Sequence, residues 1–249
     1  MNKTLFSFLI TFLAGLSTML GIIPIYLNKK KANKVISSSL AFSAGVMLTI
    51  SCFSLIPEAT ILIKENVKTF PAIIMILIFV VLGILFSSII DKKIEEKITN
   101  NNLYKLGIIS IIVLMLHNIP EGITTFISTK ASLSLGLSLS LGIALHNIPE
   151  GISIAVPIYY STNNKKKAIG YTMLSGFSEF FGAIIAYLFI AKYINCFILS
   201  VILAMTAGIM IHISIYELLP NSCDYKMKKR TIISFIIGII VMLICDSLI

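Results

Sequence analysis

One seven-residue segment occurs twice in this chain, and its side chains are of the types that bind transition metals. Residues 117–123 read His-Asn-Ile-Pro-Glu-Gly-Ile, and residues 146–152 repeat all seven letters. On a helix, His117 and Glu121 are four residues apart and Asn118 and Glu121 are three apart, so the three side chains share one face. The second copy places three side chains in the same way: His146, Asn147 and Glu150.

Together these side chains offer imidazole nitrogen, amide oxygen and carboxylate oxygen, a ligand set that suits zinc, iron and manganese. Pro120 and Pro149 each remove one backbone hydrogen bond, which membrane helices tolerate beside neighbouring protein or cavity water. Gly122 and Gly151 allow another helix or a hydrated ion to approach closely. The alternative is that the polar groups bond to one another and hold two helices together. The duplicated pairing of histidine with glutamate favours a metal site.

The elements that carry these motifs are long and apolar. Of 249 residues, 57% are hydrophobic and 12% are charged, too few to coat a soluble domain. Several stretches of more than twenty residues lack a charge and are long enough to cross a bilayer. We predict an all-α integral membrane protein that is a single transmembrane transporter domain over residues 1–249. Its eight transmembrane helices are expected at roughly 4–28, 35–59, 69–90, 105–128, 132–160, 167–190, 194–220 and 231–248.

The basic residues concentrate in alternate connections between these helices. Fifteen of the twenty Lys and Arg residues lie in the first, third, fifth and seventh connections. Because basic residues are retained on the cytoplasmic side, both termini are expected outside the cytoplasm. The net charge of +9 therefore reports topology and gives no support to a nucleic-acid partner. The four cysteines are scattered without a C-x-x-C pair, which indicates neither a disulfide framework nor a thiolate metal site.

A second internal similarity indicates how the helices are arranged. Residues 44–51 in the second helix resemble residues 207–214 in the seventh, and the similarity continues to Pro57 and Pro220. The fourth and fifth helices carry the doubled motif. Pairing the second helix with the seventh and the fourth with the fifth predicts a 3+2+3 inverted repeat, which is a recurring plan of transporters.

The spans contain acids and histidines but no Lys or Arg deep within them. A carboxylate at membrane depth costs several kcal/mol unless it is paired, protonated or hydrated, so the remaining partners are protons or metal ions. Glu179, midway along the sixth helix, is expected to face a metal. His212 and Glu217 are further candidates, although a separation of five residues points them in different directions. Glu58 lies near a helix end and is expected at the membrane surface.

These residues resemble the ZIP (Zrt/Irt-like) metal transporters, in particular their bacterial ZupT type. The similarity continues through Ala-Val-Pro-Ile-Tyr at 155–159, Ser-Gly-Phe-Ser-Glu at 175–179 and Glu-Leu-Leu-Pro at 217–220. The resemblance implies eight helices in a 3+2+3 inverted repeat, with both termini outside. It also implies uptake of zinc, with ferrous iron, manganese and related ions as further substrates.

Residue by residue, the resemblance implies two neighbouring sites. The implied zinc ligands are Glu121, His146 and Glu150. The implied ligands of an iron-accepting site are Asn118, Glu121, Asn147, Glu150 and Glu179. His117 would lie beside the path. Many relatives carry an acid or histidine where this chain has Ser54, which leaves an entrance ligand there without support.

We therefore predict uptake of divalent transition-metal ions across a bacterial inner membrane, through a site between the fourth and fifth helices. Zn²⁺ and Fe²⁺ are expected as transported substrates and not as cofactors, and the other partner is the lipid bilayer. A metal exporter is an alternative, because sequence indicates a path better than a direction. An intramembrane zinc-dependent hydrolase is a second alternative, but the chain lacks an H-E-x-x-H motif and is predicted not to be an enzyme. Whether the chain forms a homodimer is left open.

Overall fold

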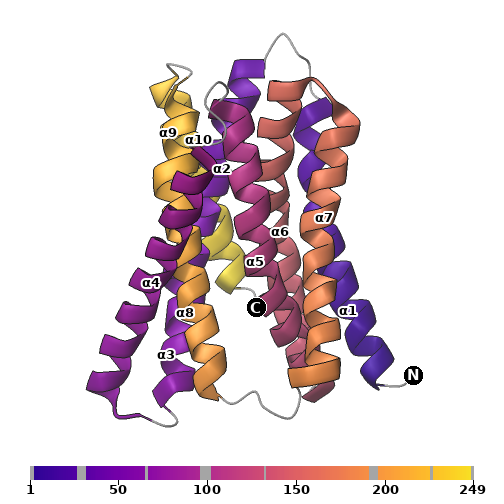
Figure 1. The fold of residues 1–249 in the computed structure, drawn as a ribbon, viewed down its shortest axis with the longest axis vertical. Helices are drawn as coiled ribbons and strands as arrows, with labels where there is room; N and C mark the ends of the chain where they lie inside the picture. The colour runs from indigo at the N-terminus through magenta and orange to yellow at the C-terminus, as the bar shows by residue number, and fades with distance from the viewer. Residues whose placement is uncertain are drawn as a thin grey trace.

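The computed structural model describes residues 3–26, 32–64, 67–95, 102–131, 133–190, 196–224 and 227–247, and these ranges are helical almost throughout (Figure 1). The first half contains α1 (Lys3–Ser17) with the 3₁₀ segment η1 (Thr18–Tyr26), α2 (Ala32–Ile50) with the π-helical η3 (Ser51–Leu55), α3 (Ile56–Lys64) and α4 (Thr69–Glu95). The central pair is α5 (Asn102–Ala131) and α6 (Leu133–Thr162). The second half contains α7 (Lys165–Ile185) with η4 (Ala186–Ile190), α8 (Cys196–His212) with η5 (Ile213–Leu218), α9 (Leu219–Cys223) and α10 (Lys228–Ser247).

Seven segments of the described residues are long and apolar enough to cross a membrane. The most hydrophobic is Thr69–Lys93, and many large apolar side chains along α4 are exposed on the outside of the molecule. An eighth helix, α10, has 20 residues, but Lys228, Lys229 and Arg230 occupy its first turn and shorten its apolar part. Apolar side chains that face outward over such lengths are stable only in lipid. The prediction of an all-α membrane protein is confirmed.

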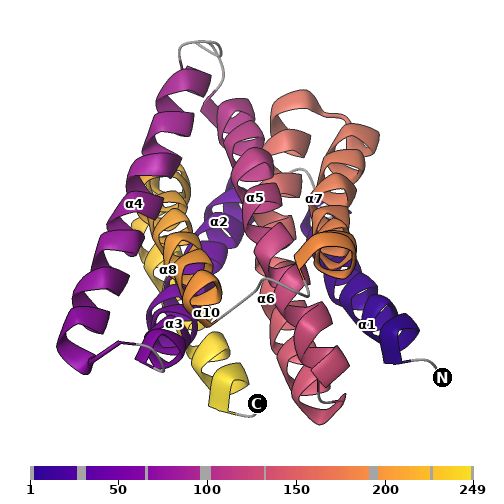
Figure 2. The ribbon, with the colours of Figure 1, turned by 60° about the horizontal axis from the view of Figure 1, so that its bottom comes forward.

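The helices form two groups, which Figure 2 shows side by side. One group contains α1 with η1, α5, α6 and α7. The other contains α2 with α3, α4, α8 with α9, and α10. The two groups meet chiefly where α2 packs on α6. The helix pair that carries the doubled motif therefore lies within the first group and reaches the second along one side.

Glycines fix the close contacts between helices, and these contacts follow the predicted inverted repeat. A Cβ atom at Gly45 of α2 would lie 2.3 Å from the carbonyl oxygen of Phe235 on α10. In the other half, a Cβ atom at Gly208 of α8 would lie 2.0 Å from the carbonyl oxygen of Val80 on α4. Only glycine permits backbones to approach so closely. The second helix thus packs on the eighth as the seventh packs on the third.

The π-helical segments η3 and η5 are a further pair in the repeat. In η3 and η5 the backbone N–H groups of Ile56 and Leu219 donate to the carbonyls five residues earlier, those of Ser51 and Ser214. Each wider turn lies just before a proline, Pro57 or Pro220. Since a proline ring clashes with the carbonyl four residues back, the wider turn makes room for it without ending the helix.

The start of α1 and the end of α10 both lie toward the lower end of the molecule in Figure 1. The basic starts of α7 (Lys165–Lys167) and α10 (Lys228–Arg230) lie at the opposite end. This separation has the polarity that the charge count of the connections predicts.

Candidate metal site

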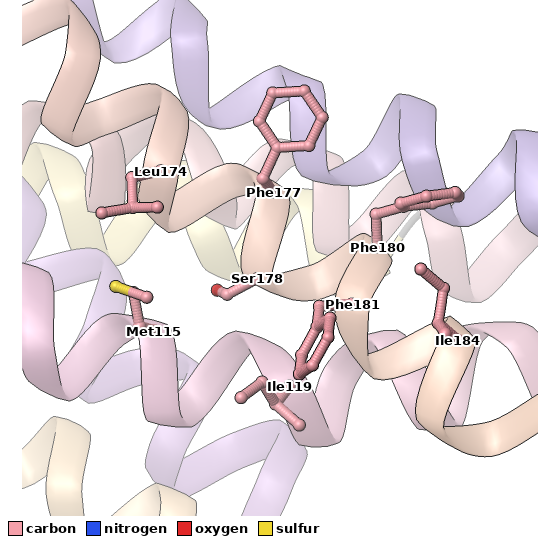
Figure 3. A pocket seen from close by; sticks show the side chains of 8 residues that line it. All are labelled: Met115, Ile119, Leu174, Phe177, Ser178, Phe180, Phe181 and Ile184. Atoms are coloured by element: carbon pink, nitrogen blue, oxygen red, sulfur yellow. The ribbon is translucent and has the colours of Figure 1, made fainter. Parts of the chain in front are cut away.

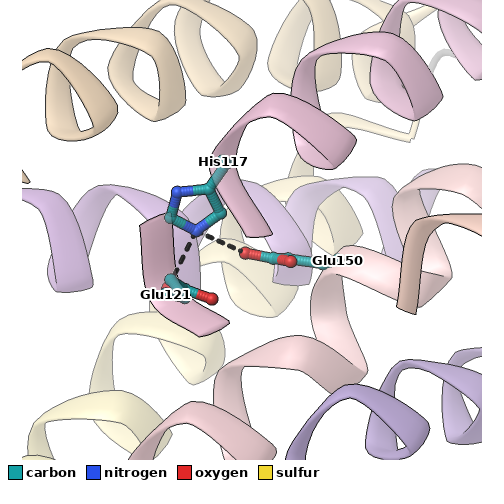
Figure 4. Close-up of side chains that lie close together, drawn as sticks. All are labelled: His117, Glu121 and Glu150. Carbon is teal, nitrogen blue, oxygen red and sulfur yellow. Dashed lines mark ion pairs between the residues drawn. The ribbon is translucent and has the colours of Figure 1, made fainter. Parts of the chain in front are cut away.

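The doubled motif brings one histidine and two glutamates together between α5 and α6 (Figure 4). The Nε2 atom of His117 lies 3.0 Å from Oε1 of Glu121 on the same helix and 3.1 Å from Oε1 of Glu150 on α6. Each of the three residues is no more than 3% exposed. One ligand atom from each lies within 4.8 Å of the others, which makes this the one such His/Cys/Asp/Glu cluster found in the described part of the chain.

The spacing of these atoms fits a zinc ion. Zinc binds imidazole nitrogen and carboxylate oxygen at about 2.0–2.2 Å, so two ligands of a tetrahedral ion lie roughly 3.3 Å apart. The observed N···O separations of 3.0 and 3.1 Å are only slightly shorter. Oε2 of Glu150 has no hydrogen-bond partner among the described residues. A buried carboxylate oxygen without a donor is costly, and a cation would satisfy it.

Two asparagines lie next to this cluster and anchor it to α1 and α7. The Nδ2 atom of Asn118 donates to the carbonyl oxygen of Ser175 at 3.0 Å. The Nδ2 atom of Asn147 donates to the carbonyl oxygen of Ala14 at 3.0 Å and to Oε2 of Glu179 at 2.7 Å. Each amide nitrogen is thereby engaged, and the amide oxygens are the remaining polar atoms.

Three buried oxygens, the two amide oxygens and one carboxylate oxygen, have no hydrogen-bond partner within the described ranges. They are Oδ1 of Asn118, Oδ1 of Asn147 and Oε1 of Glu179. All three residues are 0% exposed. Amide and carboxylate oxygens suit harder divalent ions. The site therefore has a His/Glu part and an oxygen-rich part beside it.

The motif glycines permit this arrangement. A Cβ atom at Gly122 would lie 1.8 Å from the carbonyl oxygen of Glu179, and one at Gly151 would lie 1.9 Å from the carbonyl oxygen of Thr18. Gly122 thus brings α7 onto α5, and Gly151 brings the start of η1 onto α6. Pro120 and Pro149 leave α5 and α6 as single continuous helices. The Ser43 hydroxyl of α2 donates to the carbonyl oxygen of Pro149 on α6 at 2.7 Å.

A hollow on the outer face of this helix group has different chemistry. A cavity of about 420 Å³ lies between α5 and α7, and Figure 3 shows its apolar lining, to which α5 contributes Met115 and Ile119 and α7 contributes Phe177 and Phe181. The polar side chain in its lining, Ser178, donates its hydroxyl to the carbonyl of Ser175. The lining offers an ion no ligand set like that of the motif.

Comparison with known proteins agrees with this chemistry. The family described as ZIP Zinc transporter matches residues 92–246 of the chain. The chain belongs to the ZIP family. The protein named zinc transporter ZupT of Clostridium perfringens is 37% identical over 97% of this chain and 95% of its own length. The protein of the same name in Streptococcus mutans is 40% identical over 97% of both chains, and that of Campylobacter jejuni is 37% identical over 94% and 93%.

As a ZIP protein, the chain is a multi-pass membrane transporter and not an enzyme. The structure brings together most of the site residues predicted for it. His117, a candidate ligand from the motif that the resemblance put beside the path, lies between Glu121 and Glu150, at the centre of the cluster. His146 lies on α6, but its side chain is outside the part of the structure that is described.

Two further candidates lie elsewhere in the ZIP fold. His212 stacks on Tyr216 at 5.0 Å, and its Nε2 atom is 3.9 Å from Oδ2 of Asp91 on α4. Glu217 is buried on η5, and its backbone carbonyl accepts a hydrogen bond from the side chain of Asn221. Neither belongs to the cluster that contains His117.

The first helix contributes to the site in a way that the motifs do not predict, because its Ala14 carbonyl accepts a hydrogen bond from Asn147. A signal for it exists in the sequence. Residues 15–21 read Gly-Leu-Ser-Thr-Met-Leu-Gly, and residues 176–182 read Gly-Phe-Ser-Glu-Phe-Phe-Gly. The two segments share both glycines and a serine at the same spacing, which relates the first helix to the sixth in the repeat.

Proposed function

We propose that this ZIP protein takes up zinc across a bacterial inner membrane, through the site between α5 and α6. The observation that carries the proposal is the position of His117 between two buried glutamates from different helices. The names of the similar proteins support zinc as the substrate. Both termini are proposed to lie outside the cytoplasm.

The ligands of this site suit an ion that must bind and then leave. An ion that enters from the outer side would exchange its water for the imidazole of His117 and the carboxylates of Glu121 and Glu150. Such a site must bind well enough to strip water and weakly enough to release its cargo. The N···O separations require the ring to move only by a few tenths of an ångström to bind zinc. His146 is proposed as a further zinc ligand on the strength of its equivalent place in the second motif.

The oxygen-rich part of the site supports a wider range of substrates. Asn118, Asn147 and Glu179 each present an oxygen without a hydrogen-bond partner in the described structure. Glu121 and Glu150 lie beside them and complete the proposed set. Because oxygen ligands suit harder ions, we propose ferrous iron and manganese as additional substrates.

Uptake into sealed vesicles tests this function. Purified protein is reconstituted into proteoliposomes that contain a fluorescent zinc indicator, and entry of zinc is followed for the wild type, Glu121→Gln and Glu150→Gln. Glutamine keeps the size of each side chain and removes its charge. Asp224→Asn is the matched control, because Asp224 is an exposed acid after α9.

We expect zinc entry with the wild type and the control, and loss of entry with both glutamine variants. Equal entry with all four proteins would show that the cluster is structural. Vesicles preloaded with zinc report the opposite direction, and movement from the cytoplasmic side alone would make the protein an exporter.

A further inference from the structure

The two helices that cross over the metal site, α1 with η1 and α7, are equivalent residue by residue. Gly15 and Gly176 meet at the crossing, where a Cβ atom on either would lie 2.5 or 2.4 Å from the carbonyl oxygen of the other. The equivalence extends to the hydrogen bonds around the crossing. The carbonyl of Ala14 accepts from Ser17 and from Asn147, and the carbonyl of Ser175 accepts from Ser178 and from Asn118.

One pair of equivalent residues differs in chemistry. Glu179 of α7 corresponds to Thr18 of η1, three residues beyond the glycine in each segment. Glu179 bonds to Asn147 and has one oxygen left without a hydrogen-bond partner in the described ranges. Thr18 is 0% exposed, and its hydroxyl likewise has no hydrogen-bond partner there.

The hydroxyl of Thr18 is unusual for its helix. A buried Ser or Thr in a helix normally donates to the carbonyl three or four residues earlier. Thr11 donates in this way to Ser7 at 2.9 Å. The corresponding acceptor for Thr18 is the carbonyl of Ala14, but Ser17 and Asn147 already use it. The Thr18 hydroxyl makes no bond to this carbonyl or to another acceptor in the described ranges.

The direction of the hydroxyl places it across the crossing from Glu179. A Cβ atom added to Gly176 would lie 3.3 Å from Oγ1 of Thr18. In the same way, a Cβ atom added to Gly15 would lie 3.3 Å from Oε2 of Glu179. Each side chain thus lies against the glycine of the opposite helix at the crossing, and the Glu179 oxygen there is the one that accepts from Asn147. Asn118 and Asn147 hold the same two helices through the carbonyls of Ser175 and Ala14.

We propose that the Thr18 hydroxyl is a further oxygen ligand of the oxygen-rich part of the site, bound to the ion directly or through one water molecule. This inference rests on the proposed function. Thr18 supplies a neutral oxygen at the position where α7 has the carboxylate of Glu179. It would therefore add a ligand without adding a negative charge that slows release of the ion. Its contribution favours harder divalent ions over zinc.

The test uses Mn²⁺ as the probe, with Thr18→Val, Thr18→Ser and the control Thr11→Val. Valine has the shape of threonine without the hydroxyl, and serine retains the hydroxyl. Thr11 is a buried threonine of the same helix whose hydroxyl is satisfied within the helix. Mn²⁺ binding to the purified protein is measured by electron paramagnetic resonance, and zinc uptake is measured in proteoliposomes.

We expect Thr18→Val to weaken Mn²⁺ binding by about tenfold, the lower end of what loss of a supporting ligand costs a metal site. Zinc uptake should change much less, and Thr18→Ser and Thr11→Val should resemble the wild type. Mn²⁺ binding by Thr18→Val equal to that of the wild type would overturn the inference, as would no Mn²⁺ binding by the wild type. An equal loss in Thr18→Val and Thr11→Val would also overturn it, because the effect would then be structural. The absence of zinc uptake by the wild type would instead contradict the proposed function.

Discussion

At the scale of single residues, the site depends on which helices each asparagine side chain joins by hydrogen bonds. Asn147 donates to a backbone carbonyl of α1 and to the carboxylate of Glu179 on α7, whereas Asn118 donates to Ser175 of α7 alone, to its carbonyl at 3.0 Å and to its hydroxyl at 3.5 Å. The two asparagines occupy equivalent places in the motif, yet they are not equally connected. Asn147 joins three helices at the site.

This difference predicts unequal effects of Asn147→Leu and Asn118→Leu. Loss of Asn147 leaves an oxygen of Glu179 buried without its donor, which costs about 1–3 kcal/mol or more for a charged group. We expect Asn147→Leu to lower the apparent melting temperature in detergent more than Asn118→Leu. Equal melting temperatures for the two variants would contradict the role assigned to Asn147.

The chemistry of the motif could be predicted from the sequence, because seven consecutive letters on a helix place histidine and glutamate on one face. The identity of the histidine at the centre could not. The structure places His117 between the two acids, which depends on how α5 and α6 are rotated about their axes. The sequence pattern does not contain that rotation. Thr18 was missed because a hydroxyl in an apolar helix usually bonds to its own backbone.

At the scale of the elements, the position of α7 and η1 on the central pair depends on glycine. The carbonyls of Glu179 and Thr18 occupy the space where side chains of Gly122 and Gly151 would begin. A methyl group there must push the helices apart, since the obstacle is backbone and not the end of a flexible side chain.

We therefore expect Gly122→Ala and Gly151→Ala to reduce zinc uptake and to lower the melting temperature. Gly170→Ala in α7 is the control, because a Cβ atom there would meet no atom within 4 Å. That substitution should be neutral or stabilise the helix by roughly 0.5–1 kcal/mol. If all three variants behave alike, close backbone approach is not what these glycines provide.

The extents of the helices were less predictable than their existence. The second span was expected to end at residue 59, but α3 continues to Lys64, and α5 begins at Asn102, before the expected 105. Polar residues at a membrane surface do not end a helix, because water there can hydrogen-bond to the backbone and to the side chains alike. Hydrophobicity therefore marks the span and not the helix.

At the scale of the whole molecule, the inverted repeat and the distribution of lysines predict an orientation in the membrane. Lys166 at the start of α7 and Lys130 at the end of α5 are both exposed and lie at opposite ends of the helix group. The proposed topology places Lys166 in the cytoplasm and Lys130 outside.

Labelling of single cysteines checks this topology. In a variant with the four native cysteines replaced by serine, a membrane-impermeant thiol reagent applied to intact cells should modify Lys130→Cys and not Lys166→Cys. Both should react after the membrane is permeabilised. Modification of Lys166→Cys alone in intact cells would reverse the orientation and the proposed direction of transport.

The position of a bound zinc ion is the decisive measurement for the proposed site. Crystals of the zinc-loaded protein would be measured at the zinc absorption edge, together with crystals of Glu150→Gln. We predict an anomalous peak among His117, Glu121 and Glu150 that is lost or strongly weakened in the variant. A peak only beside His212 and Asp91, unchanged by Glu150→Gln, would contradict it.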